Sequence, residues 1–147
     1  MADPVIREAV AEDIDSIMAL EQGSIVHPWA REEFVNLIND DNKICLVAVY
    51  EGRTVSYIGA ETVLDECNIG NIVTDMEYRG RGIGSALMDA LLAVLKERGI
   101  AKVFLEVESD NAPAVALYQK KKFIRYGQRR DYYGRGRDAV LMSKELC

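Results

Sequence analysis

The spacing of apolar residues along the chain predicts a mixed α/β domain. Some segments repeat apolar residues every three or four positions, as one face of a helix does, and others are rich in β-branched and aromatic residues. We expect helices over residues 14–20, 34–38, 83–98 and 112–121. We expect strands over residues 5–10, 44–50, 55–63, 67–74, 103–107, 124–133 and 139–144.

The order of these elements predicts how the sheet is built. Three strands between residues 44 and 74 follow one another across short turns, which is typical of an antiparallel meander. The strand over residues 103–107 follows a helix and is almost continuously apolar, so we expect a central strand parallel to its predecessor. The last two strands form a hairpin around residues 134–137.

The segment Ile69–Ser85 stands out for its chemistry and reads I-G-N-I-V-T-D-M-E-Y-R-G-R-G-I-G-S. A strand runs into a loop rich in arginine and glycine, and a strongly periodic helix begins near Ile83. Glycine lets the backbone approach a phosphate closely, and the first N–H groups and the dipole of a helix favour negative charge. The segment therefore predicts a cradle for a phosphorylated ligand.

Composition narrows the class of protein. The 147 residues are 49% hydrophobic and 29% charged, which is typical of one compact domain, residues 1–147. The net charge of −6 argues against a general nucleic-acid binder, so we expect no direct nucleic-acid partner. No stretch approaches the roughly 18 apolar residues of a membrane span, and the N-terminus lacks the pattern of a secretory signal. We expect no membrane partner.

The three cysteines, Cys45, Cys67 and Cys147, are widely spaced and form no C-x-x-C motif. Neither a disulfide framework nor a zinc site is predicted. We therefore expect a cytoplasmic protein without a metal.

Two other phosphate-binding motifs compete for the glycine loop. A P-loop requires a lysine after its glycines, and none follows Gly80, Gly82 and Gly84. A Rossmann fingerprint is the stronger alternative, because Glu106 lies about 20 residues on, where a ribose-binding acid is expected. The glycine spacing differs from G-x-G-x-x-G, however, and residues 75–79 separate strand from glycines where that fold needs a tight turn.

The run Arg79-x-x-Gly82-x-Gly84 is similar to [QR]-x-x-G-x-[GA], the acyl-CoA pyrophosphate motif of the GNAT superfamily of N-acetyltransferases. Within that superfamily the chain resembles the RimI group, which acetylates the N-terminal alanine of a small-subunit ribosomal protein. The likeness runs from H-P-W-A-R-E-E-F through L-E-V-x-x-x-N-A-x-A-x-x-L-Y to R-R-D-Y-Y. It implies the GNAT fold, a mixed, mostly antiparallel sheet of about seven strands with about four helices, splayed between the fourth and fifth strands.

The resemblance also implies an acid–base pair. Glu106 would take a proton from the incoming amine, directly or through water, and Tyr118 would give its proton to the CoA sulfur. Because no cysteine is placed as a nucleophile, we expect direct attack in a ternary complex. Each residue also has a purely structural interpretation that remains open. Glu106 would then be a polar residue on the exposed side of a strand, and Tyr118 a ring packed on the inner face of a helix.

Acetyl-CoA is the co-substrate that the resemblance implies. The strand before the loop would pair with the pantetheine arm, the loop would bind the pyrophosphate, and Asn111 would either bind a pantetheine amide or cap a helix. The expected binding residues are Ile72, Val73, Thr74, Arg79, Gly80, Arg81, Gly82, Ile83, Gly84, Ser85 and Asn111.

For the acceptor we expect a protein N-terminus, that of a ribosomal protein in the RimI group, in a slot lined by Trp29, Glu32, Tyr132 and Tyr133. A small-molecule amine or a lysine remains an alternative acceptor, and a non-catalytic acyl-CoA-binding regulator is an alternative function. Monomer and homodimer are both compatible with the sequence.

Two residues depart from the family pattern. Lys122 stands where glycine usually precedes Phe123, and positive φ there would cost on the order of 1 kcal/mol, so we expect the preceding helix to end differently. Glu108 stands where the RimI pattern has arginine, which bears on peptide selection. Residues 119–137 also carry eight Lys or Arg against Asp131 alone, a basic segment for CoA phosphates or for a partner.

Overall fold

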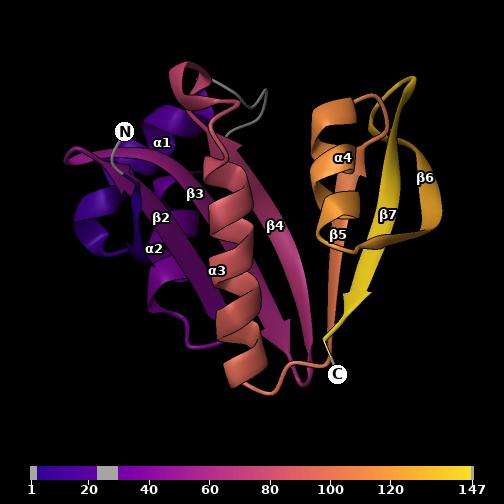
Figure 1. The fold of residues 1–147 in the computed structure, drawn as a ribbon, viewed down its shortest axis with the longest axis horizontal. Helices are drawn as coiled ribbons and strands as arrows, with labels where there is room; N and C mark the ends of the chain where they lie inside the picture. Colours follow the sequence, from indigo (N-terminus) through magenta and orange to yellow (C-terminus); the bar gives the residue numbers. More distant parts are fainter. Residues whose placement is uncertain (1–2, 23–29, 147) are drawn as a thin grey trace.

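The protein folds around one seven-stranded sheet with helices on both faces. Its structure is a computed structural model, which describes residues 3–22 and 30–146. The strand order is β1-β2-β3-β4-β5-β7-β6, and only the β4–β5 pair is parallel (Figure 1). The predicted class, a mixed and mostly antiparallel sheet with helices, is confirmed.

The observed elements match the predicted ones, with ends that shift by at most three residues. The strands are β1 Val5–Glu8, β2 Lys43–Tyr50, β3 Arg53–Val63, β4 Glu66–Thr74, β5 Lys102–Glu108, β6 Ile124–Gly134 and β7 Arg137–Glu145. The helices are α1 Ile14–Gln22, α2 Arg31–Asn39, α3 Ile83–Glu97 and α4 Ala112–Lys120. In the part of the chain that the structure describes, no helix combines the length and apolar character needed to cross a membrane.

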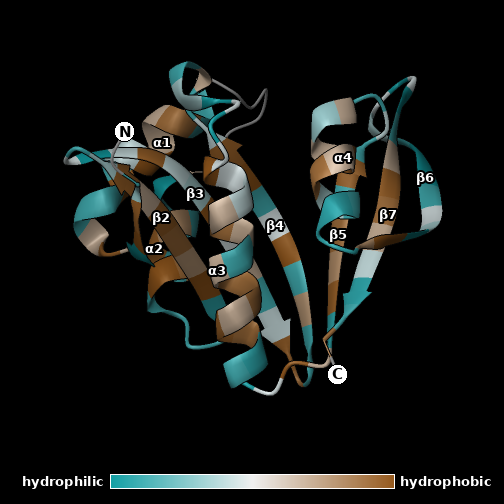
Figure 2. Ribbon diagram, viewed as in Figure 1, coloured by the Kyte–Doolittle hydropathy of each residue, from teal (hydrophilic) through white to brown (hydrophobic). Residues whose placement is uncertain are grey.

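Two hydrophobic cores lie on opposite faces of the sheet, because successive side chains of a strand point to opposite faces. The larger core lies under α3 and α4, and Leu87, Leu91 and Leu95 of α3 are fully buried in it. The smaller core joins α1 and α2 to the other face through Phe34 and Tyr57, whose rings meet edge to face. Figure 2 shows the hydrophobic stretches of the central strands running behind α3.

The sheet opens between β4 and β5. These strands pair only from Glu66 opposite Lys102 to Ile69 opposite Leu105. Beyond Ile69 they diverge, with α3 beside β4 and α4 beside β5 (Figure 1). A bulge in the β3–β4 pairing, which passes over Gly70, accompanies the divergence. The predicted splay between the fourth and fifth strands is confirmed, and it creates the space in which the candidate site lies.

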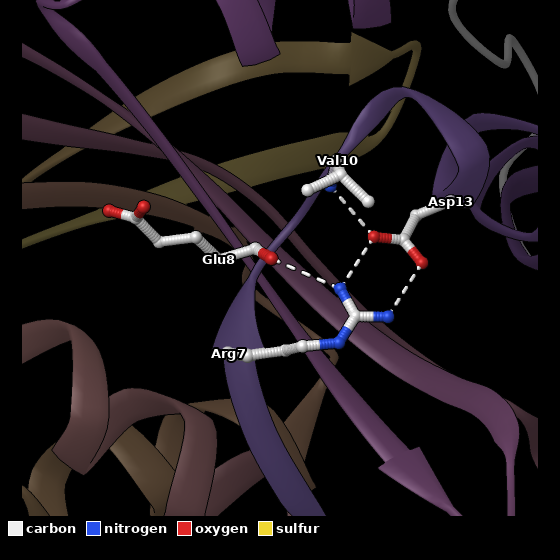
Figure 3. Close-up of polar contacts among 4 residues, drawn as sticks. All are labelled: Arg7, Glu8, Val10 and Asp13. Atoms are coloured by element: carbon white, nitrogen blue, oxygen red, sulfur yellow. Dashed lines mark hydrogen bonds and ion pairs between the residues drawn. The ribbon is translucent and has the colours of Figure 1, made fainter.

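An ion pair fixes the path of the chain from β1 into α1 (Figure 3). Arg7 donates from Nη1 to Asp13 Oδ2 at 2.7 Å and from Nη2 to Oδ1 at 3.0 Å. Asp13 Oδ2 also accepts the N–H of Val10 at 2.7 Å. The Asp13 side chain is only 8% exposed, so these hydrogen bonds satisfy a carboxylate largely withdrawn from water.

The end of α4 corrects an expectation. Lys122 adopts a φ of 72°, its N–H donates to Gln119 O at 3.0 Å, and the N–H of Phe123 donates to Tyr118 O at 2.9 Å. This is the Schellman arrangement that usually has glycine at the left-handed position. The expectation that Lys122 would make the helix end differently is therefore wrong. The two hydrogen bonds and the burial of Phe123 outweigh the backbone strain.

Candidate active site

A groove of about 710 Å³ follows the opening of the sheet, between β4, the arginine–glycine loop, the start of α3 and α4. Of the eleven residues expected to bind acetyl-CoA, all except Arg81 line this groove, and so does Tyr118. Arg81 instead places its guanidinium carbon 5.0 Å from the centre of the Tyr78 ring. Those lining it are Ile72, Val73, Thr74, Arg79, Gly80, Gly82, Ile83, Gly84, Ser85 and Asn111.

The loop has the backbone shape of an anion cradle. Gly80 and Gly82 have φ angles of 78° and 81°, in the left-handed region that favours glycine, with open space around both. Gly82 is the N-cap of α3, and its carbonyl accepts the N–H of Ala86 at 3.0 Å. The N–H groups of residues 83–85 precede this first helical bond, so they have no acceptor within the helix. They and the helix dipole suit a phosphate.

The end of β4 pairs with β3 along one edge, and its other edge, toward β5, is unpaired beyond Ile69. Ser56 Oγ donates to Val73 O at 2.8 Å, and Arg79 Nε donates to Thr74 O at 3.1 Å. Beyond Ile69, β5 no longer pairs with this strand. An extended group such as pantetheine could therefore hydrogen-bond to the β4 backbone as an added strand does.

Glu106 lies at the point where the sheet opens. It directly follows Leu105, the last β5 residue that pairs with β4. Its side chain is 32% exposed and lies on the face opposite to Leu105 and Val107, which are buried under α3 and α4. Arg129 Nη1 lies 3.6 Å from Glu106 Oε1. A hydrogen bond with Glu106 is the largest cause that raises the pKa of Tyr132, and partial burial is the second.

Tyr118 lies on the groove side of the same opening and is 5% exposed. Burial, and then the neighbouring Tyr133, raise the pKa of Tyr118 to about 12. Burial, and then the charge of Glu106, raise the pKa of Tyr133 to about 12 as well. Tyr133 thus interacts electrostatically with both Glu106 and Tyr118, and the raised pKa values keep Tyr118, Tyr132 and Tyr133 protonated at neutral pH.

Asn111 caps a helix, and it also lies where a ligand in the groove would pass. It is the N-cap of α4, where Oδ1 accepts the N–H of Ala114 at 3.3 Å, and it also lines the groove. The cap uses the carbonyl oxygen alone. The Nδ2 group is a separate donor, so capping and ligand binding are compatible in one residue.

The residues expected to bind the acceptor are divided. Tyr132 and Tyr133 meet edge to face, with ring centres 5.1 Å apart, beside Glu106. Glu32 is exposed on α2, which packs on β2, far along the sheet from β6 (Figure 1). The structure therefore does not bring Glu32 to the two tyrosines. Trp29 lies outside the described residues.

Comparison with known proteins decides the family. Residues 14–123 match the sequence model of the Acetyltransferase (GNAT) family. The chain belongs to this GNAT family. The family suggested by the glycine loop and its flanking motifs is thereby confirmed.

Relatives of this GNAT protein include N-acetyltransferases that act on proteins. It is 32% identical over 135 residues to the [Ribosomal protein bS18]-alanine N-acetyltransferase of Escherichia coli K12, covering 89% of this chain and 90% of that protein. It is 30% identical over 154 residues to an N-alpha-acetyltransferase of Sulfurisphaera tokodaii, which covers 96% of this chain and 92% of that protein. The crystal structure of the ribosomal-protein-S18-alanine N-acetyltransferase from Escherichia coli superimposes with a TM-score of 0.89 at 29% identity. The superposition covers 97% of this chain and 94% of that chain.

As a GNAT N-acetyltransferase, the protein uses acetyl-CoA as its co-substrate. The groove fits such a molecule, because the open glycines, the N–H groups that start α3 and the free edge of β4 lie along one continuous wall. Within residues 3–22 and 30–146, no cluster of three or more His, Cys, Asp or Glu side chains could hold a metal ion.

Sequence reasoning missed one buried carboxylate next to the GNAT groove. Glu21 of α1 is fully buried, and Oε1 accepts the Tyr57 hydroxyl at 2.6 Å and Asn71 Nδ2 at 3.1 Å. Since Asn71 lines the groove, this network ties α1 to its wall. A single glutamate within a helical repeat carries no sign of these partners, which lie 36 and 50 residues away.

Proposed function

We propose that this GNAT enzyme transfers acetyl from acetyl-CoA to the N-terminal α-amine of a protein, with the alanine N-terminus of a ribosomal protein as the leading candidate. The observation that carries the proposal is the cluster of Glu106, Tyr132 and Tyr133 on one side of the sheet opening, with Tyr118 on the groove side. The names of the E. coli and Sulfurisphaera relatives support a protein α-amine as acceptor.

The acceptor must lose a proton before or as it attacks, because only the free amine has the lone pair that forms the new bond. Glu106 would take that proton, directly or through one water. An α-amine has a pKa of about 8, so part of the population is already neutral near pH 7 and the base contributes modestly. Tyr132 and Tyr133 lie beside Glu106, where their hydroxyls and rings would orient the amine.

The leaving thiolate must receive a proton. Acetyl-CoA, when bound, supplies an acetyl group activated as a thioester. Tyr118 lines the groove, and its pKa of about 12 keeps the hydroxyl protonated, so it would donate to the sulfur. The new bond joins the neutral amine nitrogen to the acetyl carbon, and the carbon–sulfur bond breaks. The nitrogen gives one proton to Glu106, Tyr118 gives one proton to the sulfur, and the Tyr118 phenolate then regains a proton from solvent. This direct transfer in a ternary complex needs no cysteine nucleophile.

We also place the enzyme in the cytoplasm. Cys45 and Cys67 are free, buried thiols, which suits a reducing compartment.

The acceptor class is tested with peptides. The protein is incubated with acetyl-CoA and peptides that carry ribosomal-protein N-termini, and the products are read by mass spectrometry. A matched peptide with a blocked N-terminus and one internal lysine separates α-amine from lysine transfer. We expect acetylation of the free N-terminus only. Acetylation of the lysine peptide, or of small amines alone, would reassign the acceptor, and CoA binding without turnover would indicate a regulator.

The residue roles are tested with Glu106→Gln and Tyr118→Phe. Each should lower kcat by about 10 to 100-fold, at or below the lower end of general acid–base effects, with acetyl-CoA binding retained. Glu32→Gln, an exposed carboxylate on α2, is the matched control and should leave kcat unchanged. Wild-type rates in both site variants would remove the proposed mechanism.

A further inference from the structure

The β6–β7 hairpin departs from regular pairing just beyond Glu108, whose β7 partner is Ala139. Arg129 pairs with Ala139, and Gly134 pairs with Arg137. The intervening β6 segment, residues 130–133, therefore lies opposite a single β7 residue, Asp138. Such bulges bend a strand and re-aim its side chains. Here the re-aimed side chains include the two tyrosines beside Glu106.

Asp138 supplies hydrogen bonds that the interrupted strand pairing lacks. Its Oδ1 accepts the N–H of Asp131 at 2.9 Å, and its Oδ2 accepts Gln128 Nε2 at 2.8 Å. Asp131 has a φ of 55°, and its own Oδ1 accepts the N–H of Gly136 at 2.7 Å. The shape of the bulge thus depends on two carboxylates, one on each strand.

Arg137 ties the same hairpin to β5. It donates from Nη2 to Glu108 Oε1 at 2.6 Å and from Nε to Oε2 at 3.1 Å, the two-point geometry that makes Arg–carboxylate pairs specific. Its Nη1 also lies 3.4 Å from Tyr133 O. Glu108 follows Glu106 by two residues, so both carboxylates lie on one face of β5.

We propose that Asp138 and the Glu108–Arg137 ion pair form a frame that positions Tyr132 and Tyr133 over Glu106 to receive the acceptor amine. The inference rests on the proposed function. These are positioning residues, since their contacts are with the hairpin and β5. None of them lines the groove assigned to acetyl-CoA. The frame therefore governs acceptor binding and leaves acetyl-CoA binding alone.

The frame also accounts for the departure at position 108. A glutamate in place of the family's arginine does not present an unpaired charge to the peptide, because Arg137 binds it within the chain. The Glu108–Arg137 ion pair links β5 to the hairpin whichever residue carries which charge. Exchanging the two residues should therefore keep this link and lose only the 3.4 Å hydrogen bond from Arg137 Nη1 to Tyr133 O.

The first test is this exchange. Glu108→Arg and Arg137→Glu, each alone, place like charges together and should raise the acceptor KM by about tenfold, with kcat within about twofold. The double variant Glu108→Arg/Arg137→Glu should return the acceptor KM to within about threefold of wild type, as expected for two groups coupled in one interaction. The Kd for acetyl-CoA should stay within about twofold throughout. Arg135→Ala, an exposed residue of the same turn, is the control and should change nothing.

The second test addresses Asp138. Asp138→Asn keeps an oxygen for the Asp131 N–H but turns an NH2 group toward the Gln128 NH2 group, and should raise the acceptor KM. Adding Gln128→Glu restores an acceptor opposite the new amide and should reverse the effect. A merely structural role would lower the melting temperature without this pattern of loss and rescue in KM.

Amide hydrogen exchange of residues 130–134 gives a readout that needs no acceptor. Amide hydrogen exchange should be faster in Glu108→Arg and in Arg137→Glu, and should slow again in the double variant Glu108→Arg/Arg137→Glu. If no α-amine peptide is a substrate but exchange follows this pattern, the proposed function fails while the frame stands. Two outcomes would overturn the frame. The first is a Glu108→Arg/Arg137→Glu double variant that melts like wild type but recovers neither the acceptor KM nor the slow amide hydrogen exchange. The second is a loss of acetyl-CoA binding in the single variants.

Discussion

The N–H of Phe123 donates to the carbonyl oxygen of Tyr118 at 2.9 Å, and the two rings meet edge to face with centres 6.0 Å apart. The backbone bond and the ring contact are the two parts of a Schellman end with its hydrophobic contact. The proposed general acid is thus held by the last turn of its own helix. Lys122, between them in the chain, bears the left-handed backbone that makes both contacts possible.

Lys122→Gly should stabilise the protein. Glycine removes the strain at a φ of 72°, a gain of about 1 kcal/mol that its greater freedom in the unfolded chain partly offsets. Urea unfolding should therefore show a small rise in the free energy of unfolding, with kcat unchanged. Gly99→Ala is the matched control, because Gly99 ends α3 at a φ of 77° with open space around it. Gly99→Ala should lower the free energy of unfolding by a similar amount. A loss of stability in Lys122→Gly would show that the left-handed backbone at Lys122 is not strained.

The pKa of Tyr118 predicts the alkaline side of the pH–rate profile. Because burial raises this pKa to about 12, the phenol keeps its proton at every pH below that value. The plot of log kcat against pH should therefore hold its plateau to about pH 10. Tyr118→Phe should lower the plateau without changing its shape. A fall near pH 8 or 9 in the wild type that disappears in Tyr118→Phe would show that Tyr118 titrates much lower than its environment implies.

Asp13 should contribute stability that depends on pH. Hydrogen bonding from Arg7, and then from the N–H of Val10, lowers the pKa of Asp13 below the usual value of an aspartate, against the opposing effect of burial. A carboxylate with a lowered folded-state pKa stabilises the protein above its unfolded-state pKa, and this contribution is lost as pH falls through the folded-state value. Asp13→Asn should therefore cost about 1 to 2 kcal/mol at pH 7, and the gap to wild type should close below about pH 4.

Thermal unfolding at a series of pH values measures this gap. Asp15→Asn is the control, because Asp15 pairs with Arg31 on the surface, where the exposed pair contributes about 0 to 1 kcal/mol. A constant gap between wild type and Asp13→Asn from pH 7 to pH 3 would mean that the Asp13 charge is not what stabilises this turn.

The two buried cysteines should be unreactive in the folded protein. Burial raises the pKa of Cys45 and of Cys67 to about 12, so neither forms the thiolate that alkylating reagents require. In a Cys147→Ser variant, alkylation at pH 8 followed by mass spectrometry should label neither residue until denaturant is added. Fast labelling of Cys67 in the native protein would show that the core under α3 opens readily.

Local features of the fold were predictable from the sequence. The repeat of Leu87, Leu91 and Leu95 predicts the buried face of α3, and the almost continuously apolar run of residues 103–107 predicts the strand that carries Glu106. The glycines of the loop predict a backbone that a ligand can approach closely. Each of these features depends on residues close together in the chain. The end of α4 was predicted wrongly, because the burial of Phe123 outweighs the local preference of Lys122.

By itself, the sequence determined the order of helices and strands, the glycine-rich loop that leads into α3 and, through its motifs, the family. Only the tertiary structure decided which charged groups meet. Glu106 meets Arg129 and Tyr132, and Glu108 is bound by Arg137, 29 residues away, because β7 pairs with β5 and carries the bulged β6 with it. Such distances follow from strand pairing and side-chain packing across the whole sheet. The spacing of residues along one segment carries no record of them.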